Sequence, residues 1–225
     1  MDTKGSFDLV HFAKTCLKVN ILGILFSGLV FPVLSMVMFP QPKWNSAQIF
    51  IEHFHNVQTL TFFAGYFLVI SSTLLFVVLY MMANESKKVY ALSGLVINIL
   101  FTSIVFINYL IQTTYVPYLA NNNPPEAISM LPTFSMANPG SFAWSLEMYG
   151  WGGIGFSYVF MASIFNETII KVLFWANGIC SVAGAIITSI NMNWLFSPYG
   201  IIALVVWNLL MLLIDLDLLY LFRTK

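Results

Sequence analysis

Charged residues are scarce in this chain. Asp, Glu, Lys and Arg make up 8% of the 225 residues, against about a quarter in a typical soluble domain, so they cannot cover a water-facing surface. Hydrophobic residues make up 59% of the chain, which excludes a disordered protein. The formal net charge is zero, so we expect no nucleic acid among the partners.

Cysteine and histidine are also rare. Cys16 and Cys180 lie in or beside apolar segments without paired spacing, so we expect reduced thiols rather than a disulfide or zinc site. Glu52, His53 and His55 form the only metal-like cluster, but histidines two residues apart point to different sides of a helix. Nucleotide-binding, hydrolase and metalloprotease motifs are missing. We therefore predict no metal and no cofactor.

Long apolar segments are abundant instead. A helix needs about 20 residues to cross a bilayer, and lipid cannot satisfy the backbone of any open structure. The sequence therefore predicts an all-α, polytopic membrane helix bundle that forms a single domain over residues 1–225. Six segments qualify, and they are 19–39, 59–82, 90–116, 142–165, 172–195 and 199–222. The first of them is too long for a signal peptide and lacks a cleavage site.

The basic residues predict an orientation. Only Lys43 falls on one side of a six-span arrangement. The other side holds Lys4, Lys14, Lys18, Lys87, Lys88, Lys171, Arg223 and Lys225. Positive charge is enriched in cytoplasmic loops, so we expect both termini in the cytoplasm.

Two outer loops, 40–58 and 117–141, connect the spans on the opposite side. The first is partly apolar, and residues 45–56 suit an interfacial helix with Ile49 and Phe50 toward lipid. The second holds five prolines and several apolar residues. A loop of this length is usually functional or mobile. It would either fold over the bundle as a lid or lie on the lipid headgroups.

Polar residues recur at helical spacing within two spans. In the fifth span they are Asn177, Ser181, Gly184, Thr188 and Asn191. In the third span the same offsets give Asn98, Thr102, Val105, Tyr109 and Gln112, with Asn108 close to that face. Such stripes let membrane helices pack closely and form hydrogen bonds. Alternatively, stripes from several helices converge on a polar cavity that binds a ligand.

Glu147 is the one charged residue of the fourth span. Carboxylates inside a membrane are costly and frequently functional. Lys43 is the only basic residue on its side, so Glu147 would be neutral, hydrogen-bonded to Asn108 or Gln112, or hold a cation. The plainer interpretation is a carboxylate that reaches the water of the headgroups.

Asp215 and Asp217 lie toward the inner end of the last span. Basic residues are plentiful on that side, so we interpret these acids as partners in structural ion pairs. The available cations are Lys14, Lys18, Lys87 and Arg223.

A set of residues in the middle of the chain resembles uncharacterised bacterial six-span membrane proteins. The set comprises Asn108-Tyr109, Gln112, Val116-Pro117, Trp144, Glu147 and Gly150. The resemblance covers most of the chain and implies the bacterial cytoplasmic membrane, but no activity.

Three functions are compatible with these patterns. The first is binding or transport of a small solute or cation through a polar cavity between the helices. The candidate ligand-binding residues are Glu147, Asn108, Gln112, Tyr109, Asn98, Asn177, Ser181 and Thr188. The second is a sensor or assembly partner without transport, acting with lipid and another membrane protein or a second copy of itself. The third is a lipid-modifying enzyme that uses Glu147, although no catalytic motif supports an enzyme.

Overall fold

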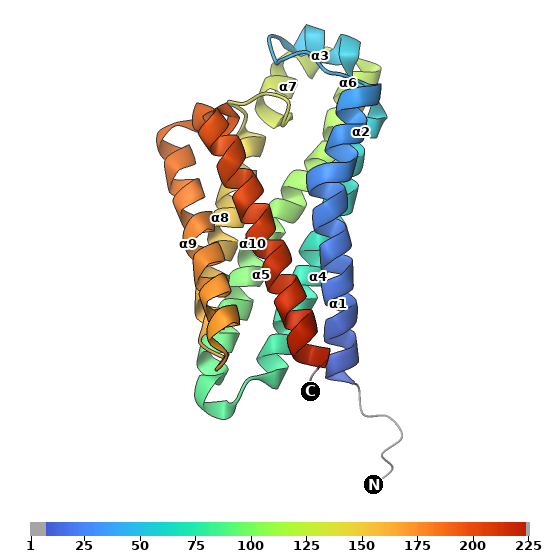
Figure 1. Cartoon of the computed structure of the whole chain (residues 1–225). Coiled ribbons are helices and arrows are strands. Elements are labelled where there is room, and N and C mark those ends of the chain that lie inside the picture. Colours follow the sequence, from blue (N-terminus) through green and yellow to red (C-terminus); the bar gives the residue numbers. More distant parts are fainter. Residues whose placement is uncertain (1–7, 224–225) are drawn as a thin grey trace.

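All regular structure in this computed structural model is helical (Figure 1). The structure describes residues 8–223 and contains no strand within them, so the all-α prediction is confirmed. The elements are α1 (Leu9–Leu25), η1 (Phe26–Val30), α2 (Phe31–Met38), α3 (Ala47–His53), η2 (Asn56–Thr59), α4 (Leu60–Met82), η3 (Glu85–Lys87), α5 (Lys88–Leu110), η4 (Ile111–Tyr115), α6 (Val116–Asn122), α7 (Ala127–Phe134), α8 (Phe142–Ala162), α9 (Thr168–Ile190), η5 (Met192–Phe196) and α10 (Pro198–Arg223).

Five of these helical stretches are long and apolar enough to cross a membrane, which marks a membrane-embedded protein. They are Leu9–Met38, Asn56–Met82, Glu85–Asn122, Thr168–Ile190 and Pro198–Arg223. The remaining predicted span, the fourth (142–165), corresponds to α8, which has 21 residues and runs beside α5 and α9 (Figure 1). Four glycines, two serines and Glu147 make α8 less apolar than the other five. The six-span count therefore stays a prediction.

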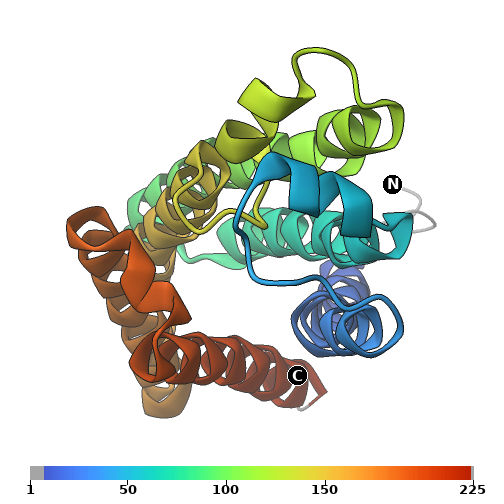
Figure 2. The ribbon, with the colours of Figure 1, turned by 90° about the horizontal axis from the view of Figure 1, so that it is seen from above.

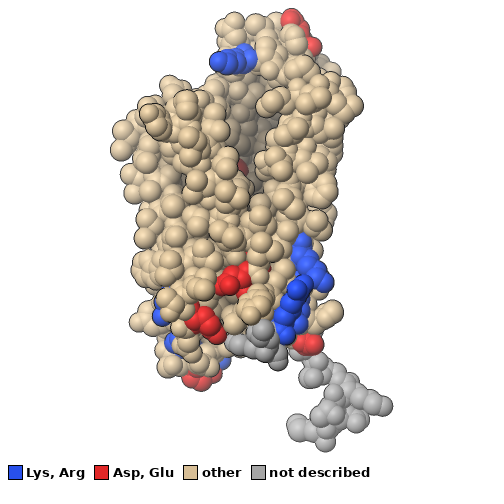
Figure 3. Space-filling view, viewed as in Figure 1, with Lys and Arg blue, Asp and Glu red and all other residues tan. Residues whose placement is uncertain are grey.

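The orientation also stays a prediction. Charged side chains gather at the end of the bundle where α1 begins and α10 ends, and few lie at the other end (Figure 3). This is the asymmetry on which the predicted cytoplasmic termini depend. Lys4 and Lys225, two of the residues used for that prediction, lie outside the described part of the chain.

The low hydropathy of α8 follows from its position between α5 and α9. A Cβ atom added at Gly153 would collide with the ring of Phe101 on α5. One added at Gly155 would lie 2.7 Å from the carbonyl oxygen of Gly178 on α9. Small residues allow this close approach of membrane helices. Because protein covers both of these faces, more than half of the residues of α8 are buried and few need to match lipid.

Two π-helical turns interrupt the long helices. The turn η1 lies just before Pro32, and η4 lies just before Pro117. Proline lacks the amide hydrogen and its ring presses on the preceding turn, so the backbone accommodates it by widening. Ser27 of η1 and Gln112 of η4 both line the cleft described below.

Three short helices form a cap over one end of the bundle (Figures 1 and 2). Helices α3, α6 and α7 share a small apolar core that includes Phe50, Leu119 and Leu131. Part of the segment 117–141 thus packs against α3 in this cap, and the choice between a lid and a loop on the headgroups stays a prediction. The helix predicted within 45–56 is present as α3. The prediction that Phe50 faces lipid is wrong, because its ring packs 5.6 Å from Trp44 and 5.4 Å from Phe54 within the cap.

A neutral donor, rather than a cation, satisfies Asp215 at the opposite end of the bundle. The side-chain amide of Asn20 on α1 donates to both carboxylate oxygens, at 3.1 and 3.3 Å. Ser71 on α4 donates to the amide oxygen of Asn20 at 2.8 Å. All three side chains are buried, so this network joins α1, α4 and α10 inside the core.

The predicted ion pairs are therefore wrong for Asp215. Among residues 8–223 the one salt bridge joins Lys88 to Glu85, at 2.7 Å. Lys87, a predicted partner, instead donates to the Asn166 side chain at 2.6 Å. Asp215 lies about two turns inside the helix end that carries Arg223. Basic side chains remain hydrated near the helix ends, while the carboxylate is fixed in the core.

We predict that Asn20→Leu destabilises the protein more than Asp215→Asn does. The leucine removes the donor and leaves a buried carboxylate unpaired, which costs about 1–3 kcal/mol or more. The asparagine keeps an acceptor for Asn20 and removes the charge, so its cost should be below about 1 kcal/mol. Thermal unfolding in detergent measures both, with Asp217→Asn as the control outside the network. An Asn20→Leu midpoint no lower than that of the control would contradict the prediction.

Candidate functional site

A deep cleft of about 920 Å³ lies beneath the cap. Its walls come from α8, α9 and α10 on one side and from η1, α4 and α5 on the other. Figure 3 shows the hollow on the side of the bundle, between the cap-proximal half of α10 and the η1–α2 rod. Ligand sites in proteins commonly enclose about 300–1,000 Å³ and are mostly apolar with a few placed polar groups. This cleft has both properties.

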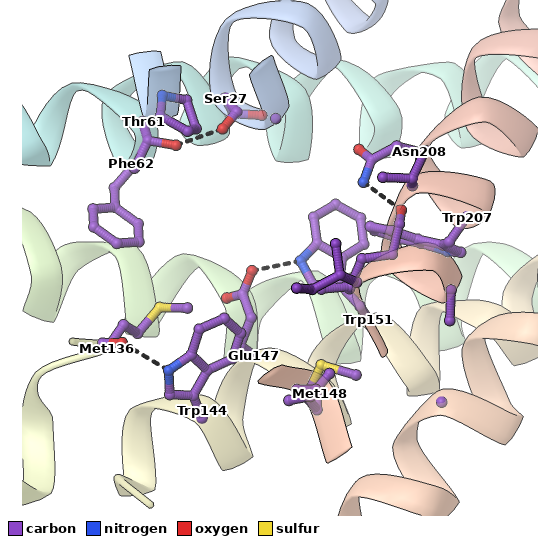
Figure 4. A pocket seen from close by; sticks show the side chains of 18 of the residues that line it. Ser27, Thr61, Phe62, Met136, Trp144, Glu147, Met148, Trp151, Trp207 and Asn208 are labelled. Atoms are coloured by element: carbon purple, nitrogen blue, oxygen red, sulfur yellow. Dashed lines mark hydrogen bonds between the residues drawn. The ribbon is translucent and has the colours of Figure 1, made fainter. Parts of the chain in front are cut away.

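Glu147 supplies the single formal charge in the lining of the cleft. Its carboxylate accepts hydrogen bonds from the side-chain amide of Asn108 at 2.9 Å and the hydroxyl of Tyr109 at 3.0 Å. The indole of Trp151, one turn further along α8, donates at 2.9 Å (Figure 4). A carboxylate offers about four lone-pair positions. Three protein donors therefore leave acceptor capacity toward the cleft, where Glu147 keeps accessible surface.

The carboxylate has no positive partner among the described residues, in which Lys88 and Glu85 form the one ion pair. All of its donors are neutral groups of α5 and α8. Burial of an ionised carboxylate without a counter-charge is costly. No positive side chain of the described residues therefore balances the charge of an ionised Glu147.

Aromatic rings surround the carboxylate (Figure 4). The ring centroids of Trp151 and Trp207 lie 5.1 Å apart at 69°, and those of Phe62 and Tyr109 lie 5.7 Å apart. Trp207 is oriented by a hydrogen bond from its indole to the hydroxyl of Ser181, at 2.8 Å. Aromatic faces attract cations and form the cages that recognise quaternary ammonium groups. The rings and the carboxylate together provide an environment that suits an organic cation.

A short strap, residues 134–136, forms part of the roof of the cleft. The side-chain amide of Gln112 donates to the Phe134 carbonyl at 2.7 Å and accepts from the Met136 amide at 3.1 Å. Trp144 adds a 2.7 Å hydrogen bond from its indole to the Met136 carbonyl. The strap thereby ties the cap to η4 and to the first turn of α8.

The structure brings together five of the eight predicted site residues. Glu147, Tyr109, Gln112 and Ser181 line the cleft, and Asn108 supports Glu147 without lining it.

Asn98, Asn177 and Thr188, the other three, do not line the cleft. The indole of Trp194 donates to Thr188 at 3.0 Å. Asn98 and Asn177 are buried, and both polar side-chain atoms of Asn98 and the amide oxygen of Asn177 lack hydrogen-bond partners. The reason is geometric, because α8 lies between α5 and α9 and separates these parts of the two polar stripes. Other members of the stripes do share a space, since Tyr109 and Gln112 of one stripe and Ser181 and Gly184 of the other line the same cleft.

Sequence reasoning included Tyr109 but did not assign the tryptophans to the site. Trp144, Trp151 and Trp207 line the cleft, but tryptophan is common in membrane helices and carries little signal by itself. The spacing of Trp151, four residues after Glu147, was the available clue. On α10, the cleft is lined by apolar residues such as Ile201 and Val205. A search of the sequence for polar residues therefore cannot identify this wall of the cleft.

Compared with known proteins, the chain matches no protein-family model, no curated protein sequence and no solved structure. Any assignment of function therefore depends on the site itself.

We predict that Gln112→Leu releases the strap. The change leaves the Phe134 carbonyl and the Met136 amide unpaired in a partly buried place, at a cost of about 1–3 kcal/mol for each group. Hydrogen exchange of the Met136 amide should accelerate at least tenfold relative to the wild-type protein. Gln48→Leu is the matched control, because Gln48 pairs with Glu52 on the exposed surface of the cap. Unchanged exchange at Met136 in Gln112→Leu would show that the strap is held by other contacts.

Proposed function

We propose that this protein binds an organic cation in the cleft, as a membrane binding protein or a transport subunit. Glu147 receives the positive group. The observation that carries the proposal is the carboxylate itself, the one charged group in the lining, held by three neutral donors and facing an aromatic-walled space. A bound ammonium group would supply the missing counter-charge, and the surrounding rings would add cation–π attraction.

An organic cation suits this site better than a metal ion. Hard metal ions bind several oxygen ligands at once. Within residues 8–223, no three His, Cys, Asp or Glu side chains gather as a metal site. Three of the lone-pair positions of Glu147 already accept protein hydrogen bonds. A single hydrogen bond or ion pair from an ammonium group uses the remaining acceptor capacity.

The proposed membrane arrangement follows from α8. With 21 residues at about 1.5 Å each, α8 is long enough to cross a hydrocarbon core. It would complete six spans, with both termini in the cytoplasm and the cap on the outer side. The resemblance carried by Asn108-Tyr109, Gln112 and Glu147 further suggests the bacterial cytoplasmic membrane.

The two alternatives have weaker support. A non-transporting interaction protein would explain the buried Asn98 and Asn177, which lie between packed helices, but it leaves the cleft without a role. A lipid-modifying enzyme would need a nucleophile or metal beside Glu147. The neighbours that contact its carboxylate are an amide, a phenol and an indole.

We predict that tetramethylammonium raises the unfolding midpoint of the purified protein and that Glu147→Gln abolishes the increase. A ligand at about 100 times its dissociation constant adds roughly 2.7 kcal/mol of stability. The glutamine preserves the size of the side chain but removes the charge. Glu126→Gln is the matched control, because Glu126 is an exposed acid of the cap that does not line the cleft.

The neutral compound tert-butanol, which is close in size, should leave the midpoint unchanged. A shift that persists in Glu147→Gln, or that tert-butanol reproduces, would refute a cation site at this carboxylate. No shift with any of a panel of organic cations would favour the interaction protein instead.

A further inference from the structure

We infer that the ligand is an amphiphile with an amine or ammonium head group and an alkyl or acyl chain, and that it enters the cleft sideways from the membrane. This inference rests on the proposed cation site at Glu147. It adds the chemical class of the ligand and its route, which follow from the size, lining and opening of the cleft.

The cleft is much larger than a head group requires. Cavities of about 300–1,000 Å³ commonly hold drug-sized ligands, which are far larger than the five heavy atoms of tetramethylammonium. The whole cleft encloses about 920 Å³. The remaining volume is too large for a small cation and is suited to a chain of many atoms.

The lining is mostly apolar and carries a single formal charge, that of Glu147. The other polar side chains of the lining, which include Gln58, Thr61 and Asn208, are neutral. Ile202 and Val206 of α10 add successive apolar turns to the wall of the cleft. One carboxylate in a mainly apolar cleft is complementary to a positive head group attached to a hydrocarbon chain.

The cleft opens toward the side of the bundle, where Figure 3 shows the hollow. At the end of the bundle, the cap helices lie on the side of α4 and α5 (Figure 2), and Ser135 and Met136 of the strap line the cleft. Further from the cap, η1 and α10 meet closely, since a Cβ atom added at Gly28 would lie 3.2 Å from the Asn208 side chain. Between these two closures, α10 and the η1–α2 rod are separated by the hollow seen in Figure 3.

Apolar, exposed side chains border this lateral opening. Leu29 and Val33 lie on the η1–α2 rod with 58% and 50% of their surface exposed. Ile202 and Val205 on α10 are 60% and 54% exposed. Ile202 and Val205 also line the cleft, so they lie at its edge. Both helical stretches are apolar enough to span a membrane, which would place this edge of the cleft against the bilayer. A molecule that already resides in the membrane can enter here without displacing the cap.

The test uses the tryptophans of the cleft as reporters. Four of the six tryptophans of the chain line it, namely Trp144, Trp151, Trp194 and Trp207. The protein is reconstituted in nanodiscs of phosphatidylglycerol, which carries no amine, and titrated with trimethylammonium probes. One probe is tetramethylammonium, and the other carries an eight-carbon chain that ends in bromine, a quencher of tryptophan fluorescence. Octyl glucoside with the same terminal bromine is the uncharged control.

We expect the brominated ammonium probe to quench fluorescence saturably. Half-saturation should require at least about tenfold more probe in Glu147→Gln, because the head group loses its partner. Ala203→Trp, which places a large side chain in the lining of the cleft, should also raise the probe concentration at half-saturation about tenfold. Leu209→Trp is the matched control, since Leu209 is 52% exposed on the same helix but does not line the cleft.

The possible outcomes separate this inference from the proposed cation site. Suppose tetramethylammonium stabilises the protein through Glu147, but quenching by the chain-bearing probe is unsaturable or insensitive to Ala203→Trp. The site is then a cation site and the amphiphile is refuted. If neither probe shows dependence on Glu147, both proposals are wrong. Equal saturable quenching by the uncharged glucoside would identify a chain-binding groove and refute the need for a positive head group.

Discussion

The close contact of α8 with α5 and α9 is the constraint on which the rest of the structure depends. At Gly153 and Gly155 no larger side chain fits, because Phe101 on one side and the Gly178 carbonyl on the other occupy the space. This packing places α8 in the interior and covers two of its faces with protein. Glu147 can therefore lie on a helix of membrane-spanning length without facing lipid, and its third face is available to form a cleft.

A single carboxylate then determines the chemistry around it. Neutral donors from Asn108, Tyr109 and Trp151 share its negative charge without cancelling it. Each donor is itself confined to the core or to an aromatic cluster, so the carboxylate is oriented before any ligand arrives. Preorganised polar groups in a low-dielectric setting interact more strongly than the same groups in water. The lining of the cleft thus holds one charged group among neutral and aromatic side chains.

The two ends of the bundle use buried acids in opposite ways. Asp215 receives a bifurcated hydrogen bond from Asn20 and closes the contact between α1 and α10. Glu147, toward the cap, keeps accessible surface in a cleft that opens where α10 and α2 separate. One acid therefore lies in a closed network of protein hydrogen bonds, while the other is accessible from the cleft. The difference arises from packing, since both acids lie on long helices of the bundle and neither has a described cation beside it.

The helices themselves were predictable from the sequence. The segment 142–165 corresponds to Phe142–Ala162, and 199–222 corresponds to Pro198–Arg223. A long apolar run can be recognised locally in the sequence, and a backbone surrounded by lipid must form a helix. The inward face of α5 was also predictable from spacing, and Asn98, Tyr109 and Gln112 are all buried. Tertiary structure alone decided which polar residues share a space. Asn20 and Asp215 are 195 positions apart, and the cleft walls come from helices far apart in the chain. Periodicity identifies the face of a helix, but the partner of that face depends on how the whole bundle packs.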